Sequence, residues 1–465
     1  MSAQPVSFAW PGGVVSLDDR GRVLLQVEGV SAPVRLGLTP DPGLREVLVE
    51  YDTAEHAGSD EYEVSQRVTV GEHCQLRWAT EAASPARVEL EVEVPPGQQA
   101  WVWPSGADGL LAVFPETGLG PALVVQVMQG SLTWAGESAD GRRLRLGVAE
   151  LAAGDRQVTM LRVRRLPTLA IAENLLPRWY EPLALVEGEG WEADIADFGL
   201  QAEPLTVVYE EDDETVLIAA PAPGKHRIGL HGRRGVTELM LEVAPDLDAL
   251  TRQVAEELLA AGHATWTSAG AVVVQQAVAL GLLPSDRHVE DALDRFDWTT
   301  RGDSLAIAFG CRRALQEGER AMAEEAVRQL VALPDRRRQA QVFGLVALAA
   351  ATLGGDLPSL AGVLRPVSRP VLADRLHSRR RTAVAADELG GVINRLGAGL
   401  PGRPIGLSPA DAAELVILLE ACPERWPEAR LAADTSQEMR LKLLAGYAAG
   451  DIVDPTALAW LLIGG

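Results

Sequence analysis

The hydrophobic pattern of this 465-residue chain changes its period once, at Asp246, and this change constrains the fold more than any other feature. Before it, apolar and polar residues alternate, as in strands with one buried face; residues 87–94 are the clearest case. After it, Leu247, Leu250 and Val254 recur at the spacing of one helical face. The sequence therefore predicts a multidomain chain with antiparallel β-structure first and α-helices second.

Turn signals divide the β half into two units. Residues 1–166 contain many short strands and tight turns such as Asp140-Gly141, which predicts a large antiparallel β-sandwich. Residues 166–182 carry three prolines and break the alternation, so we expect a connector there. Residues 183–245 hold six short alternating segments, which favour a small immunoglobulin-like β-sandwich.

Residues 246–465 predict a carboxy-terminal α/α helical stack, either a solenoid or a small toroid. Four junctions in it share a glycine followed by a hydrophobic residue and a proline, a combination that ends a helix and prevents its resumption. We therefore expect antiparallel helix pairs, with each glycine in the left-handed conformation. The irregular spacing of the junctions matches no named repeat family. Their glycines are Gly281, Gly354, Gly397 and Gly450.

Charge limits the partners of the chain. The formal net charge is −23, which disfavours nucleic acid. Only Lys225 and Lys442 are lysines, a bias that we attribute to a GC-rich coding sequence. Residues 334–381 are basic in this acidic chain and contain two arginine triplets. We interpret the triplets either as solvated helix ends or as a patch that docks another protein or an acidic surface. The triplets are Arg336, Arg337, Arg338 and Arg379, Arg380, Arg381.

Cysteine usage and the termini indicate the compartment. Cys74, Cys311 and Cys422 are odd in number and far apart, which favours a reducing environment over a disulfide framework. The first residues lack the pattern of a signal peptide, and the most apolar helical segment, 342–353, is too short to cross a membrane. We expect a cytoplasmic protein without membrane contact.

The sequence carries no motif for a cofactor or a metal. Neither common phosphate-binding glycine loop is present, and the histidines do not have the spacing of metal ligands. We therefore expect neither a cofactor nor a metal ion. Trp101 and Trp103 alternate onto one face of a strand. Two indoles on one face can stack on a sugar or a partner, or fill a sandwich core, and we favour the core.

One segment carries a family resemblance. Residues 297–303, Asp-Trp-Thr-Thr-Arg-Gly-Asp, precede a helical run and are similar to the Trp-Arg-Asp segment of glucosidases that have a β-sandwich followed by an (α/α) toroid. Residues 62–68 resemble the amino-terminal sandwich of glycogen-debranching-type enzymes. The resemblance implies that Trp298, Arg301 and Asp303 line a sugar site, with a carboxylate pair as acid and base. The alternative is an ordinary helix start with Asp303 near its cap.

Two functions follow as hypotheses. The first is a noncatalytic binding or scaffold protein that docks a macromolecular partner on its helical stack. The alternative is a carbohydrate-active enzyme, a glycoside hydrolase by its resemblance, or an inactive relative. Since no convergent catalytic set is present, we lean against an enzyme. A pocket in the helical half with facing carboxylates and an aromatic wall would favour the alternative, and a filled helical core would count against it.

Overall fold

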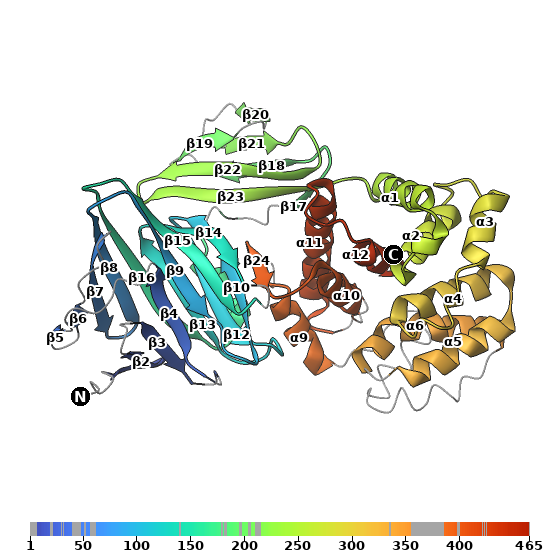
Figure 1. Cartoon of the computed structure of the whole chain (residues 1–465), viewed down its shortest axis with the longest axis horizontal. Coiled ribbons are helices and arrows are strands. Elements are labelled where there is room, and N and C mark those ends of the chain that lie inside the picture. The colour runs from blue at the N-terminus through green and yellow to red at the C-terminus, as the bar shows by residue number, and fades with distance from the viewer. Residues whose placement is uncertain are drawn as a thin grey trace.

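A computed structural model gives the architecture of the chain (Figure 1). It describes residues 7–18, 22–39 apart from 29 and 31, 48–50, 53–55, 62–138, 141–177, 180, 184–194, 198–202, 206–209, 215–333, 336–354, 386–397 and 400–464 apart from 421, 423 and 425. Strands fill the first half and helices the second, so the predicted order of β-structure and α-structure is confirmed.

Two antiparallel sheets form the large sandwich. In the described residues, the long sheet has twelve strands and the second sheet has seven. The long sheet contains, in spatial order, β1 (Ser7–Trp10), β2 (Gly13–Leu17), β3 (Val23–Val27), β4 (Val34–Thr39), β9 (Ala86–Glu93), β15 (Arg143–Leu151), β14 (Leu132–Glu137), β11 (Ser105–Gly106), β23 (Gly235–Ala244), β22 (Gly224–Gly232) and β19 (Gly199–Ala202), with β17 (Ala184–Val186) parallel to β23. The seven-stranded sheet contains β24 (Arg403–Ile405), β10 (Gln98–Trp103), β12 (Leu110–Pro115), β13 (Ala122–Gln129), β16 (Arg156–Leu166), β8 (Cys74–Ala82) and β7 (Tyr62–Val70).

The alternation of the sequence places the sandwich core. Val88, Leu90 and Val92 on β9 are fully buried between the two sheets, whereas the charged residues between them point outward. A buried valine or leucine contributes about 1.5–3 kcal/mol, so a strand of this pattern is held firmly in one register. The hairpin predicted around Asp140-Gly141 is present, since β14 pairs with β15. Asp140 itself lies outside the described residues.

The smaller β unit is continuous with the long sheet. A three-stranded sheet of β18 (Gly190–Asp194), β21 (Thr215–Ala219) and β20 (Thr206–Tyr209) shares a core with β22 and β23. Gly106 on β11 pairs with Thr237 on β23, which makes the hydrogen-bonded sheet continuous. Gly106 has φ +73, and a Cβ there would lie 2.3 Å from the Val236 carbonyl oxygen, so only glycine permits this approach. The domain boundaries stay predictions. The remaining short elements are β5 (Leu48–Glu50), β6 (Thr53–Glu55) and the 3₁₀ helix η1 (Leu169–Leu175).

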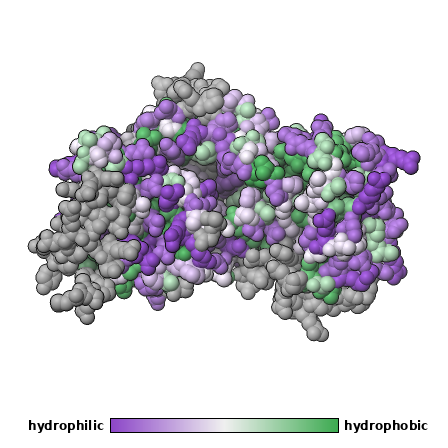
Figure 2. Space-filling view, in the orientation of Figure 1, coloured by the Kyte–Doolittle hydropathy of each residue, from purple (hydrophilic) through white to green (hydrophobic). Residues whose placement is uncertain are grey.

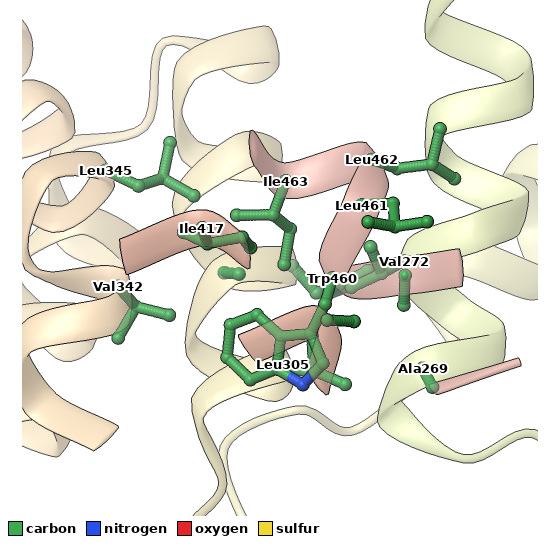
Figure 3. Packing of buried hydrophobic residues seen from close by; sticks show 14 of the residues in the cluster. Ala269, Val272, Leu305, Val342, Leu345, Ile417, Trp460, Leu461, Leu462 and Ile463 are labelled. Carbon is green, nitrogen blue, oxygen red and sulfur yellow. The ribbon is translucent and has the colours of Figure 1, made fainter. Parts of the chain in front are cut away.

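The helical half packs around one apolar core, part of which Figure 3 shows around Trp460, Leu305 and Ile417. Asp246 caps the first helix, because its carboxylate accepts the Ala249 N–H. The helices are α1 (Leu247–Ala261), η2 (His263–Thr265), α2 (Ser268–Ala279), α3 (Arg287–Asp294), α4 (Ser304–Glu317), α5 (Arg320–Ala332), α6 (Arg336–Leu353), α9 (Ala386–Arg395), α10 (Pro409–Glu420), α11 (Ala429–Ala448) and α12 (Thr456–Gly464).

The helix stops have the predicted backbone. Gly281, Gly354, Gly397 and Gly450 all have positive φ, between 72° and 94°. At Gly450, the following two N–H groups donate to the Gly446 carbonyl and close the end of α11.

The helical half returns to the β half after residue 395. β24 adds an antiparallel edge strand to β10, and α11 packs across β23, β22 and β17. Asn394, buried at the end of α9, donates to the Gly118 carbonyl oxygen in the turn after β12, at 2.7 Å. In Figure 1, β22 and β23 run from the sandwich toward α11, so strands and helices meet over a broad front.

Candidate functional site

A cleft of about 760 Å³ lies where the outer face of the long sheet meets the helical half. Strands β14, β15, β22 and β23 form one side, and α11 with the turn before β24 forms the other. We call it the central cleft. Figure 2 shows a hollow with hydrophilic side chains beneath β22 and β23. Five cations and four carboxylates line the cleft, namely Arg87, Lys225, Arg227, Arg403, Lys442, Glu150, Glu238, Glu242 and Asp451.

Both lysines of the chain belong to this cleft. Lys442 on α11 pairs with Glu438, one helical turn earlier, at 2.5 Å. Lys225 on β22 bridges the two halves, since its ammonium lies 3.6 Å from Glu242 on β23 and 2.8 Å from Asp451 after α11. The lysines and carboxylates thus form a polar layer between strand and helix.

Burial and neighbouring charges shift the pKa values of several groups in and beside this layer. Burial raises the pKa of Glu242, although Lys442 and Lys225 act to lower it. Burial acts to lower the pKa of Lys442, but the nearby Glu438 and Glu242 carboxylates outweigh it and the pKa is raised. Burial and the same two carboxylates raise the pKa of Tyr180 well above its ordinary value. At neutral pH the lysine therefore stays charged and the phenol stays protonated.

Aromatic rings and unpaired guanidinium groups complete the cleft. Arg403 stacks on Trp134, with its guanidinium carbon 3.8 Å from the ring centroid. The Trp103 and Tyr180 rings are 5.5 Å apart. Burial lowers the pKa of Arg403. Within the described part of the chain, neither Arg403 nor Arg227 forms an ion pair with a carboxylate. Stacked rings, free cations and carboxylates together can hold a ligand rich in hydroxyl groups or bearing anionic groups.

Sequence reasoning missed this site, although one signal for it was present. Lys225 and Lys442 are the only lysines of the chain, and coding bias alone explains such scarcity. That the two lie in one cleft follows from the packing of α11 against β22. Trp134 and Arg403 are far apart in the sequence, and no local sequence pattern predicts that they stack on each other.

The predicted Trp-Arg-Asp segment lies elsewhere, at the start of α4. Trp298 is buried with its ring against Gly310, where a Cβ would lie 2.6 Å from the ring. Asp303 caps α4, because it accepts the Ala306 N–H at 2.9 Å and the Ser268 hydroxyl at 2.6 Å. The ordinary interpretation, a helix start with Asp303 at its cap, is therefore confirmed, and the sugar-binding role of the segment stays a prediction.

Arg301 and Asp303 do line a second, smaller pocket of about 430 Å³. It lies at the starts of α2, α4 and α12, with Glu414 and Trp460 also in its wall. Trp460 is 2% exposed, and in the described residues no acceptor receives its indole N–H. Trp298 is not among the lining residues, which the resemblance did not anticipate. The helical half therefore has a filled core together with a carboxylate-lined pocket at one end of its helices.

The remaining predicted residues fall in three places. Trp101 and Trp103 are buried on the face of β10 that meets the smaller β unit, as the core interpretation expects. The docking role of the arginine triplets stays a prediction. Arg336, Arg337 and Arg338 open α6, and Arg379, Arg380 and Arg381 lie outside the described residues.

Two features are absent from the described residues. None of their helices combines the length and apolar character that crossing a membrane requires. Nowhere in them do three or more potential metal ligands gather. Cys74, Cys311 and Cys422 are all buried, and none of the three is part of a disulfide bond.

Comparisons with known proteins give a fold but no family. No protein-family model matches the sequence, and no curated protein matches it. A solved structure of a polysaccharide lyase matches 96% of this chain and 82% of its own, with a TM-score of 0.52 and 10% identity. A solved heparinase III matches 51% of this chain and 40% of its own, with a TM-score of 0.25 and 8% identity. This chain therefore shares its fold, β-sheets packed against a helical region, with a polysaccharide lyase.

Proposed function

We propose that this chain is a carbohydrate-binding protein and that the central cleft holds a segment of a polysaccharide. The carrying observation is the composition of the cleft, in which the partly exposed rings of Trp134 and Tyr180 stand beside five cations and four carboxylates. Sugar rings have apolar faces that stack on aromatic rings and hydroxyl edges that need both donors and acceptors. The fold shared with a protein described as a polysaccharide lyase supports the same class of ligand.

The size of the cleft fits this role. Its volume of about 760 Å³ falls within the range of roughly 300–1,000 Å³ that is typical of pockets for small ligands. The stacked Trp134 and Arg403 form one wall, and the polar layer of Lys225 and Glu242 forms the floor beside β22 and β23. A segment of polysaccharide lying between them would meet apolar and polar surface together.

Binding is better supported than bond cleavage. A proton-transfer mechanism needs a donor and an acceptor at the reacting bond. At neutral pH Tyr180 can act only as a proton donor, because its pKa is raised and the phenol stays protonated. Glu242, whose pKa is also raised, is the carboxylate that could accept a proton. Both lie within the polar layer, and Lys225 lies 3.6 Å from Glu242. Glu242 is thus engaged by a lysine, and within the described residues no hydrogen bond joins it to Tyr180, so the noncatalytic form of a carbohydrate-active fold is the proposal.

The test is a binding titration with polysaccharides of defined charge. Unsubstituted dextran, dextran sulfate and polygalacturonate are titrated into the whole protein by calorimetry, and the same mixtures are assayed for new reducing ends and for the ultraviolet absorbance of unsaturated uronates. We expect binding of at least one polymer without cleavage. Exchanging Arg227 and Arg403 for alanine should weaken that binding about tenfold, since two contacts of ~0.7 kcal/mol each are lost.

A charge-matched variant controls for the loss of two cations. Arg287 and Arg430 are 95% and 94% exposed and lie on α3 and α11, outside the cleft. Their exchange for alanine should leave binding unchanged. The proposal fails if the protein binds none of the three polymers, or if the cleft variant and the control bind equally well. Release of products would replace binding with catalysis as the function of the cleft.

A further inference from the structure

The smaller pocket, of about 430 Å³, lies where three helices begin. Its wall includes Ser268 at the start of α2, Ser304 at the start of α4 and Thr456 at the start of α12. The N–H groups of a first helical turn have no carbonyl group within the helix to accept them, and they lie at the positive end of the helix dipole. We call this cavity the helix-start pocket. Among the described residues, none lines both it and the central cleft.

The two carboxylates in the wall of the helix-start pocket are already engaged within the protein. One oxygen of Asp303 accepts the Ala306 N–H at 2.9 Å, and the other accepts the Ser268 hydroxyl at 2.6 Å. Glu414 on α10 also has a partner within the chain. Neither carboxylate therefore needs a cation or a hydroxyl group from a ligand.

Several donors of the pocket, by contrast, have no acceptor. Trp460 is 2% exposed, and its only polar side-chain atom, the indole nitrogen, donates to no acceptor in the described residues. Figure 3 shows this nitrogen on the edge of the ring beside Leu305, and both residues line the pocket. The backbone N–H groups of Ala269 and Leu305 likewise have no acceptor within the described part of the chain. A buried donor is costly to leave unpaired, so an acceptor from a ligand would stabilise this arrangement.

Arg301 adds a positive charge to these donors. Its guanidinium carbon lies 5.3 Å from the centroid of the Phe296 ring, a distance typical of a cation–π contact. Within the residues that the structure describes, it forms no ion pair with a carboxylate. The groups of the pocket that lack partners are therefore one cation and a set of N–H donors.

We propose that the helix-start pocket binds the phosphate group of a small phosphorylated molecule. A phosphate supplies negative charge together with several strong acceptor oxygens, and helix starts are favourable places for it. The volume of about 430 Å³ falls in the range of roughly 300–1,000 Å³ that is typical of small-ligand pockets, so an organic part fits beside the phosphate. Ala269 and Leu305 give that part an apolar wall. This binding is independent of the function proposed for the central cleft.

A carboxylate or an uncharged sugar fits the free groups less well. A carboxylate has two oxygens in one plane, whereas the donors belong to α2, α4 and α12 and to the loop that carries Arg301. The tetrahedral oxygens of a phosphate can accept from several directions at once. An uncharged sugar would leave Arg301 without a counter-charge, and its hydroxyl groups need free acceptors as well as donors.

The experiment compares ligands that differ in one group. Glucose 6-phosphate, glucuronate, glucose and inorganic phosphate are titrated into the whole protein by calorimetry. Glucose 6-phosphate should bind most tightly, and glucose should not bind to this pocket. Arg301→Gln should weaken the binding of glucose 6-phosphate about tenfold, because a charge-assisted contact is lost. Trp460→Phe, which keeps a ring and removes the indole N–H, should weaken it about fivefold.

A matched variant controls for the loss of one positive charge. Arg287 is 95% exposed on α3 and lines neither pocket, so Arg287→Gln should leave the binding of glucose 6-phosphate unchanged. The binding of polysaccharides to the central cleft should be the same in all of these proteins, which separates this proposal from the function proposed above.

Each contrary result overturns the proposal at a different step. If neither phosphate ligand binds the wild type, the pocket is not a phosphate site. If glucose 6-phosphate binds the wild type and Arg301→Gln equally well, it binds elsewhere. Tighter binding of glucuronate would make a carboxylate the recognised group, and equally tight binding of inorganic phosphate would exclude recognition of a larger molecule. If Arg301→Gln melts far below Arg287→Gln, Arg301 is structural and Trp460→Phe decides whether the pocket binds phosphate.

Discussion

At the scale of single residues, burial decides what the two lysines contribute. Lys442 has 15% of its side chain exposed and faces two carboxylates, whereas Lys225 has 30% exposed and lies nearer the solvent. A buried ion pair is expensive to break, since the partner keeps its desolvated charge, but a partly exposed one is screened. Two chemically identical residues in one cleft therefore differ in their effect on stability.

We expect Lys442→Met to lower the free energy of unfolding by about 3–5 kcal/mol, because Glu438 is left as a buried, unpaired acid and Glu242 keeps only Lys225 as a nearby cation. The same substitution at Lys225 should cost only about 0–1 kcal/mol. Urea unfolding followed by circular dichroism at neutral pH compares the two. Equal losses would mean that solvent reaches Lys442 as easily as Lys225.

At the scale of elements, the left-handed glycines set where the helices stop. Gly450 has φ +76, and a Cβ there would meet no atom within 4 Å, so a side chain at this position has only backbone strain to overcome. Gly390, inside α9, has a single neighbour, a Leu119 methyl group at 3.9 Å, and no positive φ. The two positions separate the cost of a left-handed backbone from the cost of glycine in a helix.

Gly450→Ala should therefore destabilise the protein by about 1–2 kcal/mol, which is the price of a left-handed alanine. Gly390→Ala should stabilise it by up to about 1 kcal/mol, since helix propensity favours alanine. Thermal unfolding of the two single variants measures both. A stabilising effect at Gly450 would contradict its role as a helix stop.

At the scale of the whole molecule, the contacts made by Asn394 and by the chain that follows it fix the helical half to the sheets. Gly402, with φ +88, lets the chain approach β10 so closely that a Cβ would lie 2.2 Å from the Val102 carbonyl oxygen. Asn394 satisfies a buried carbonyl of the turn after β12. The central cleft exists only because this junction holds its two walls in place.

Asn394→Ala should cost about 1–3 kcal/mol, because the Gly118 carbonyl oxygen loses its buried donor. It should also admit protease between the halves. The wild type, by contrast, should resist limited proteolysis around Pro245, where α1 begins within three residues of the end of β23. Gel electrophoresis of timed digests checks both expectations, and rapid cleavage of the wild type into two stable fragments there would disprove the fixed junction.

The sequence by itself determined the local structure of this protein. Alternation placed Val88, Leu90 and Val92 in a core, and a glycine such as Gly450 ended its helix, because side-chain period and backbone φ act over a few residues. Only the tertiary structure decided which charged and aromatic residues come together in the central cleft. Arg403 reaches Trp134, and Lys225 meets Asp451, across more than two hundred residues of chain. Such contacts depend on strand pairing and on the return of α11 to the sheet, and no periodic pattern along the chain encodes them.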